Sequence, residues 1–233
     1  MADEAPPPEA TEPPIPISGA LDSMLRTYLV RAQKTLQRCQ DLLELHGKLE
    51  SDGLDATETQ TSDLLRAVVV LTHACMEDTL RTVGKYALPA ASREALDDIP
   101  FYVGGRSAQK VSLGYMTEYR GQTVEMLIAH TVENYLERMT FSSTTDIVNL
   151  LRRIGISLDG SNMLPALDEM INRRHEIVHR ADIGEDWRPP VEIEAETVRR
   201  WIGAVSALVI RIGAELIRNE TGEGENEGVP SDP

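Results

Sequence analysis

The chain has 233 residues and a hydrophobic content of 41% with only two Phe and two Trp, so its core must be built from aliphatic side chains. Such a core favours helix-on-helix packing in one domain over a β-sandwich. The formal net charge of -15 opposes a nucleic-acid partner, because phosphate binding needs Lys and Arg, unless a local basic site supplies them.

Both ends of the sequence are acidic and of low complexity. Residues 1–18 carry a charge of -4 and are rich in Pro, and residues 219–233 carry -5 and are rich in Gly, which leaves about -6 on residues 19–218. We expect two disordered tails around one folded domain over 19–218. The first tail lacks the basic and apolar regions of a signal peptide, and no apolar run is long enough to span a bilayer, so we expect a cytoplasmic protein without a membrane partner. Cys39 and Cys75 lack metal-like spacing and are predicted to be reduced core residues.

Apolar residues three and four apart predict two long helices first. One runs from Leu21 to about Gly47, and the polar segment 50–61 follows it. Ser62-Asp63 is a candidate cap for the second, which runs from Leu64 to Ala87 and is closed by Pro89. Its segment 67–71 is apolar on nearly every side and indicates a buried central helix.

The second half continues in the same way. We expect a short helix at 93–97, a loop over 101–106, helices at 122–139 and 144–155, a helix capped by Ser161 or Asn162, and a last long helix at 194–218. No strand is predicted. The fold class is all-α, a bundle with long antiparallel helices.

One stretch, Asn172-Arg173-Arg174-His175-Glu176-Ile177-Val178-His179-Arg180-Ala181-Asp182, concentrates charged and titratable side chains. On a helical wheel Arg174 falls inside an apolar stripe, which requires that it be paired or face a cavity. The members of that stripe are Leu164, Leu167, Met170, Ile171, Ile177 and Val178. Asn172, His175 and His179 line a neighbouring polar edge.

The residues His175-Glu176-Ile177-Val178-His179 also satisfy the HExxH pattern of zinc metalloproteases. The flanking arginines oppose a bound cation, and a third ligand is a guess among Glu192, Glu194 and Glu196. We therefore predict no metal and no other cofactor.

The segment Arg174-His175-Glu176-Ile177-Val178-His179-Arg180-Ala181-Asp182 resembles the RxxxxH motif of the HEPN superfamily, and is most similar to the prokaryotic RiboL-PSP-HEPN branch. Residues 63–71 through Glu77 resemble the central helix of that branch. The resemblance implies a HEPN-like helical bundle that dimerises and acts as a metal-independent endoribonuclease.

By that resemblance Arg174 would hold the scissile phosphate and His179 would be the catalytic histidine. Imidazole exchanges protons near neutral pH and guanidinium forks onto phosphate oxygens, which suits both roles. His175 and Asn172 would orient the substrate or the dimer mate, and Arg173 and Arg180 would bind flanking phosphates. Glu77 would pair with Arg174, although a surface carboxylate is the alternative.

Arg174 and His179 lie about 140° apart on the wheel, which argues against a site within one helix and favours a composite site in a homodimer. The expected partners are an RNA substrate, a second copy of the chain, and an antitoxin or other defence protein. In the alternative interpretation the chain is a non-catalytic HEPN-like module that binds RNA or protein, with Arg174 a structural ion pair and His179 a C-terminal helix residue.

Overall fold

The computed structural model describes residues 23–51, 57–103, 106–108, 112–180 and 192–221. This part of the chain is predominantly helical. Its α-helices are α1 (Ser23–Ser51), α2 (Glu58–Ala87), α3 (Arg93–Asp97), α4 (Leu113–Met116), α5 (Val124–Arg138), α6 (Thr144–Arg153), α7 (Leu164–Arg180) and α8 (Ala195–Thr221). Short 3-10 turns at Leu88–Ala90 and Thr117–Tyr119 and two short strands complete it. The all-α prediction is confirmed.

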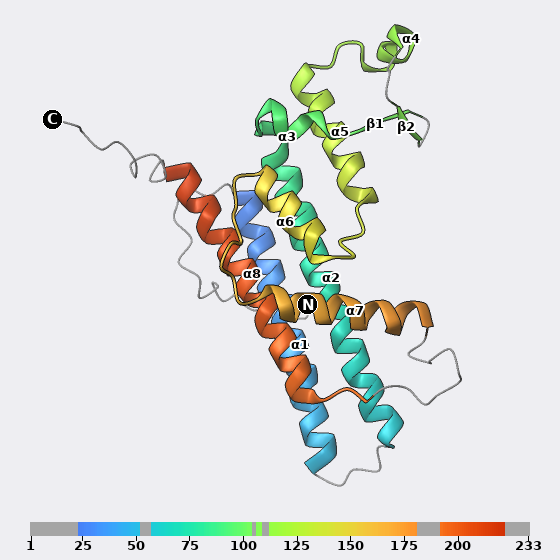
Figure 1. Ribbon diagram of the computed structural model, residues 1–233, viewed down its shortest axis with the longest axis vertical. Helices are drawn as coiled ribbons and strands as arrows, with labels where there is room; N and C mark the ends of the chain where they lie inside the picture. Colours follow the sequence, from blue (N-terminus) through green and yellow to red (C-terminus); the bar gives the residue numbers. More distant parts are fainter. Residues whose placement is uncertain (1–22, 52–56, 104–105, 109–111, 181–191, 222–233) are drawn as a thin grey trace, which may run out of the picture.

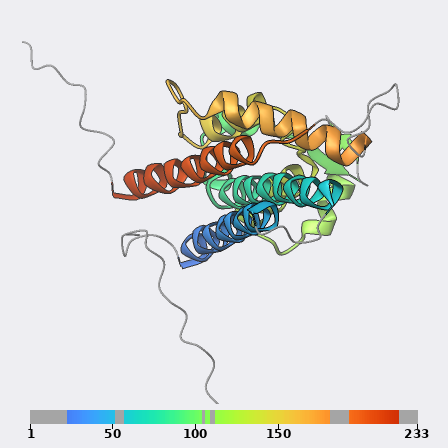
Figure 2. The same cartoon turned by 90° about the horizontal axis from the view of Figure 1, so that it is seen from below.

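Three long helices form the body of the molecule. α1, α2 and α8 lie side by side, with α1 and α2 antiparallel, and α7 crosses α2 at a steep angle (Figures 1 and 2). The buried residues along them are aliphatic, for example Leu36 in α1, Val68 in α2 and Val205 in α8. Burial of these faces, at about 25 cal/mol per Å² of apolar surface, stabilises the bundle. None of the described helices combines the length and the apolar character needed to cross a membrane.

The start of α2 differs from the prediction. The helix begins at Glu58, and the Thr57 side chain accepts a hydrogen bond from the Gln60 backbone while the Gln60 side chain accepts one from the Thr57 backbone. Because this reciprocal capping box starts the helix at Thr57, Ser62-Asp63 lies inside α2 and is not its cap. The predicted polar connector is correspondingly shorter.

The segment 67–71 of α2 is less buried than predicted. Val68 and Val69 are buried, but Ala67 is exposed, and Val70 and Leu71 are half-buried. The helix therefore keeps one partly uncovered side, because α1, α7 and α8 cover only part of its circumference.

The described residues between 90 and 120 lie in a small lobe at one end of α2 (Figure 1). The predicted helix at 93–97 is confirmed. The predicted loop over 101–106 is wrong, because β1 (Phe101–Val103) pairs antiparallel with β2 (Arg106–Ala108). Three-residue strands are too short to show a period-two pattern, which explains why no strand was expected.

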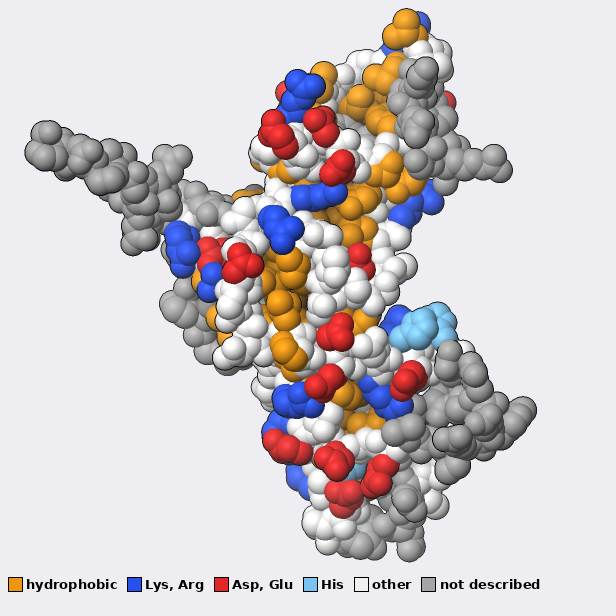
Figure 3. All heavy atoms as spheres, viewed as in Figure 1, with side chains coloured by type: hydrophobic (Ala, Val, Ile, Leu, Met, Phe, Trp, Pro, Cys, Tyr) orange, Lys and Arg blue, Asp and Glu red, His pale blue; other side chains and the backbone are white. Residues whose placement is uncertain are grey.

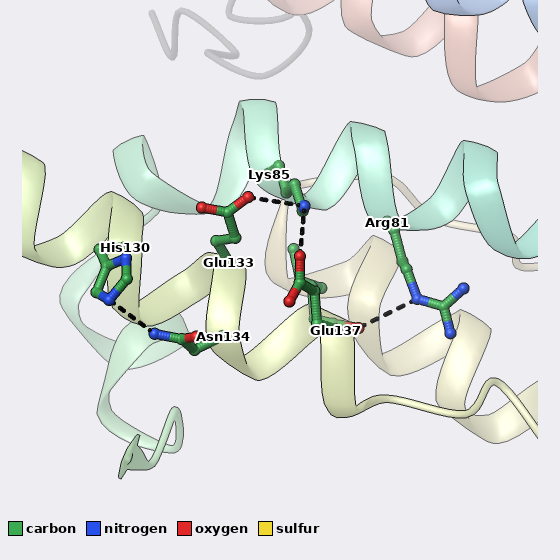
Figure 4. Close-up of polar contacts among 7 residues, drawn as sticks. Arg81, Lys85, His130, Glu133, Asn134 and Glu137 are labelled. Carbon is green, nitrogen blue, oxygen red and sulfur yellow. Dashed lines mark hydrogen bonds and ion pairs between the residues drawn. The ribbon is translucent and has the colours of Figure 1, made fainter. Parts of the chain in front are cut away.

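The contact between α2 and α5 is close. A Cβ atom added to Gly84 would lie 2.9 Å and 3.0 Å from the two Cδ atoms of Leu136, so the absent side chain admits α5 at short range. Beside this contact Lys85 Nζ lies 2.9 Å from a Glu133 carboxylate oxygen and 3.3 Å from one of Glu137 (Figure 4). These contacts fix how α5 sits on α2, and thereby where the chain leaves α5.

The other boundaries need small corrections. α6 is capped by Ser143 with Asp146, and α7 begins at Leu164 after the candidate caps Ser161 and Asn162. α8 continues to Thr221, past the predicted domain end at 218. Both cysteines are buried free thiols, as predicted. The tail residues 1–18 and 222–233 lie outside the described residues.

Candidate functional site

The first half of α7 is anchored in the core. Leu167, Met170 and Ile171 are buried, and they hold α7 against α2 and α8. Beyond Ile171 the predicted apolar stripe weakens, since Ile177 is only half-buried and Val178 is 46% exposed. The second half of α7 thus emerges from the core, and its side chains border open space.

That space is a pocket of about 520 Å³ between α2, α7 and the connection from α5 to α6. We call it the site pocket. Its described lining residues are His73, Glu77, Arg81, Thr140, Ser142, Ile171, Arg174, His175 and His179. In the space-filling view, histidine side chains at the exposed end of α7 border a hollow in the surface (Figure 3). The structure therefore brings Arg174, His175, His179 and Glu77 to one place, although they come from different helices.

Arg174 is half-buried and lacks a partner among the described residues. Its Nε atom is buried and makes no hydrogen bond. The predicted pairing with Glu77 is wrong: the Glu77 carboxylate accepts a hydrogen bond of 3.3 Å from Arg81, one turn along the same helix. A buried guanidinium nitrogen without an acceptor carries a free-energy cost, and among the described residues no carboxylate forms an ion pair with Arg174.

The two histidines of α7 are adjacent. The ring centroids of His175 and His179 lie 4.5 Å apart, and both side chains are exposed at the pocket. Arg174 and His179 line the same pocket of one chain, so the wheel separation of about 140° did not predict their placement.

His73 lies at the inner side of the pocket and is only 2% exposed. Burial lowers the pKa of its imidazole most, and the positive charges of Arg174 and Arg81 lower it further. The Glu77 carboxylate and a hydrogen bond to the Phe141 backbone oppose this shift. The net pKa is below the ordinary value, so His73 is held neutral at neutral pH.

The connection between α5 and α6 forms the remaining wall. Arg81 donates hydrogen bonds to the backbone oxygens of Leu136 (3.3 Å) and Met139 (2.8 Å). Figure 4 shows its side chain reaching from α2 to the end of α5. Phe141 is fully buried with a φ of 20°, an uncommon value for a residue with a side chain. With Phe141 turned into the core, its neighbours Thr140 and Ser142 border the pocket and offer hydroxyl groups there.

Sequence reasoning missed His73, Arg81, Thr140 and Ser142. Arg81 was detectable in part, because it stands four residues after Glu77 on one helix, the spacing of an intrahelical ion pair. The two hydroxyl residues carried no signal, since they reach the pocket only through the packing of α5 on α2.

Two predicted residues lie outside the site pocket. The Asn172 amide donates a hydrogen bond of 3.2 Å to Asp168, and Arg173 forms an ion pair of 2.8 Å with Glu176. Neither is among the residues that line the site pocket. The side chain of Arg180 lies outside the described residues.

The zinc interpretation finds no third ligand. In the described part of the chain no three His, Cys, Asp or Glu side chains are grouped closely enough to hold a metal ion. The candidate ligands Glu192, Glu194 and Glu196 are exposed and do not join His175 and His179.

Comparison of the chain with family models, curated proteins and solved structures finds no significant match. The functional argument therefore depends on the site pocket and on the residues that line it.

Proposed function

We propose that the site pocket is the active site of a metal-independent endoribonuclease of HEPN type. One observation carries the proposal: Arg174, with a buried Nε atom that lacks an acceptor, lines the same pocket as His175 and His179. A permanent cation beside two imidazoles is the set of groups needed to bind a phosphodiester and to move protons around it.

In the proposed reaction the 2'-hydroxyl of the RNA attacks the neighbouring phosphorus atom. His179 accepts the hydroxyl proton, and the bond from phosphorus to the 5'-oxygen breaks. The imidazolium of His179, or a protonated His175, donates a proton to that oxygen. The products are a 2',3'-cyclic phosphate and a 5'-hydroxyl, so atoms and charge balance without an added reactant. Arg174 would offset the extra negative charge on the phosphoryl oxygens in the transition state.

His175 supports this chemistry by its position. Its ring lies beside that of His179, so it is available as the second proton-transfer group or as a donor to the substrate. Asn172, Arg173 and Arg180 are proposed to contact RNA outside the pocket, because Asn172 and Arg173 have partners on their own helix. Glu77 acts on the site through Arg81, which it pairs with, and so holds the wall formed by Thr140 and Ser142.

We further propose that the active form is a homodimer in the cytoplasm, with RNA as substrate. The partly uncovered side of α2 that includes Ala67 and Val70 is proposed as the contact with a second copy. A role as a toxin or defence effector, with an antitoxin or other defence protein as partner, follows from the family resemblance and stays a prediction.

A second candidate is a non-catalytic HEPN-like module that binds RNA or protein. The ion pair between Arg173 and Glu176 favours it, because this carboxylate neutralises a cation that phosphate would otherwise use. In this case the site pocket would bind an RNA phosphate and release it unchanged.

The test incubates the purified chain with cellular RNA in excess EDTA, beside Arg174→Ala and His179→Ala. Matched controls are Arg199→Ala and His130→Ala, which remove an exposed arginine and an exposed histidine outside the pocket. We expect cleavage in EDTA by the wild type and both controls, and loss of at least about a hundredfold in both pocket variants. Cleavage that stops in EDTA, or that survives in His179→Ala, would contradict the proposal. RNA binding without cleavage would favour the second candidate.

A further inference from the structure

The first half of α1 has a charge that differs from the rest of the chain. Residues 23–40 contain Arg26, Arg31, Lys34 and Arg38 and no Asp or Glu, although the whole chain carries -15. The apolar face of this helix, with Leu29 and Leu36, is buried in the core. Its basic residues are therefore presented on a helix that has no apolar face left for a membrane.

Three of these cations share one face of α1. Arg31, Lys34 and Arg38 follow each other at spacings of three and four residues and are exposed. Together with Thr27, Val30 and Thr35 they line a shallow pocket of about 370 Å³, the α1 pocket. Within the described residues no carboxylate lies within ion-pair distance of Lys34 or Arg38. Both charges are available to an external anion.

The α1 pocket is linked to the site pocket. A connecting pocket of about 360 Å³ shares Arg31 and Thr35 with the α1 pocket, and shares Glu77 and Arg81 with the site pocket. Because each hollow shares lining residues with the next, the three adjoin one another from α7 across α2 to α1, and we call them the path.

Charge along this path is uneven. In the connecting pocket both carboxylates are paired, Glu77 with Arg81 at 3.3 Å and Asp78 with Arg31 at 3.5 Å. This middle part is neutral in sum, whereas the α1 end adds Lys34 and Arg38. A strand of negative charges would cross the middle without net repulsion and be held at the α1 end.

We infer that this path binds a single-stranded RNA that extends from the site pocket, with Lys34 and Arg38 on its phosphates. The inference rests on the proposed function for the identity of the ligand. A single strand fits because it is flexible enough to follow connected shallow hollows, and basic grooves commonly track its backbone. Thr35, between the cations, offers a hydroxyl for phosphate or ribose oxygens.

The test measures binding of fluorescently labelled RNA to the full chain carrying His179→Ala, so that the RNA stays intact. The variant Lys34→Gln/Arg38→Gln is compared with Arg93→Gln/Arg152→Gln, which removes the same charge at exposed positions on α3 and α6. For a long single strand we expect the α1 variant to raise Kd about tenfold or more and to reduce the salt slope of log K by about 1.4, at roughly 0.7 for each lost phosphate contact. The control pair should leave both unchanged.

RNA length gives the second readout. A dinucleotide fills only the site pocket, so its Kd should be the same in the α1 variant and its parent. An equal loss in the control pair, an equal loss for the dinucleotide, or no loss for the long strand would each overturn the inference. The inference would also be overturned if duplex RNA or phosphatidylserine vesicles bound as tightly as the single strand and lost the same affinity in the α1 variant. The face would then bind any polyanion. A changed sedimentation coefficient in the α1 variant would instead make it an interface between copies.

Failure of the path and failure of the nuclease remain distinguishable. If the wild type cleaves RNA but binding is insensitive to Lys34 and Arg38, only the path is wrong. If the length-dependent binding holds and no RNA is cleaved, only the catalytic proposal is wrong.

Discussion

The guanidinium carbon of Arg81 lies 5.6 Å from the ring centroid of Phe141, so a side chain of α2 covers the residue on which the connection from α5 to α6 turns. The same guanidinium bonds the Leu136 and Met139 carbonyls and the Glu77 carboxylate. One side chain thus joins α2, the end of α5 and the wall of the site pocket.

Arg81→Met should destabilise the fold by about 1.5–3 kcal/mol, because it removes charge-assisted hydrogen bonds and leaves half-buried acceptors unsatisfied. Urea unfolding measures the loss. Arg81→Lys keeps the charge near Glu77 and should recover part of it. Stability equal to the wild type in Arg81→Met would contradict the anchoring role.

Arg174→Met should behave in the opposite way. Since Arg174 Nε has no acceptor, replacing the side chain by an apolar one of similar length should leave the free energy of unfolding within about 0.5 kcal/mol of the wild type or above it. RNA cleavage should be lost in the same protein. A strongly destabilised Arg174→Met would instead indicate a structural role for this arginine.

The pH dependence of stability should report His73. Its pKa is lowered in the folded protein, chiefly by burial, with Arg174 and Arg81 adding to the shift and Glu77 opposing it. Below the ordinary value of about 6.5 the unfolded chain binds the proton more readily, so the free energy of unfolding should decrease as the pH falls through the window between 6.5 and the lower folded pKa.

Urea unfolding between about pH 7.5 and 5 checks this, with His73→Gln as the test and His130→Gln as the control. His73→Gln should flatten the decrease, whatever its stability at neutral pH, whereas His130→Gln should keep it. The same slope in His73→Gln as in the wild type would assign the pH dependence to other groups.

The two thiols should be unreactive in the folded protein. Burial and the neighbouring Cys39 raise the pKa of Cys75 to about 12, and burial also raises that of Cys39. Because the thiolate is the reacting form, neither should react with a thiol reagent at about pH 8 until the chain is unfolded, when both should react. Rapid labelling of the native protein would show that the contact of α1 with α2 opens.

The sequence was sufficient for the long helices, because apolar residues recur over many turns of α1, α2 and α8. The sequence was insufficient where an element was too short to show a pattern, or where its boundary lay outside the run of regularly spaced apolar residues. Three-residue strands such as β1 show no pattern, and the cap at Thr57 precedes the apolar run that marked the second helix. For the site, the cluster from Arg174 to His179 was visible because it lies on one helix. Thr140 and Ser142 were not visible, because tertiary packing alone brings them to the pocket. The partner of Glu77 was not predictable either, because Arg174 on another helix and Arg81 on its own helix were both within reach of the pattern.

Gly84, which does not line the site pocket, affects how α5 packs on α2. The missing side chain sets how closely Leu136 approaches α2, and the chain that follows Leu136 becomes a wall of the site pocket. A methyl group at this position would meet the two Cδ atoms of Leu136, so either that side chain or the start of the connection to Thr140 and Ser142 must shift. The packing at one helix contact therefore bears on the position of a pocket wall that it does not touch.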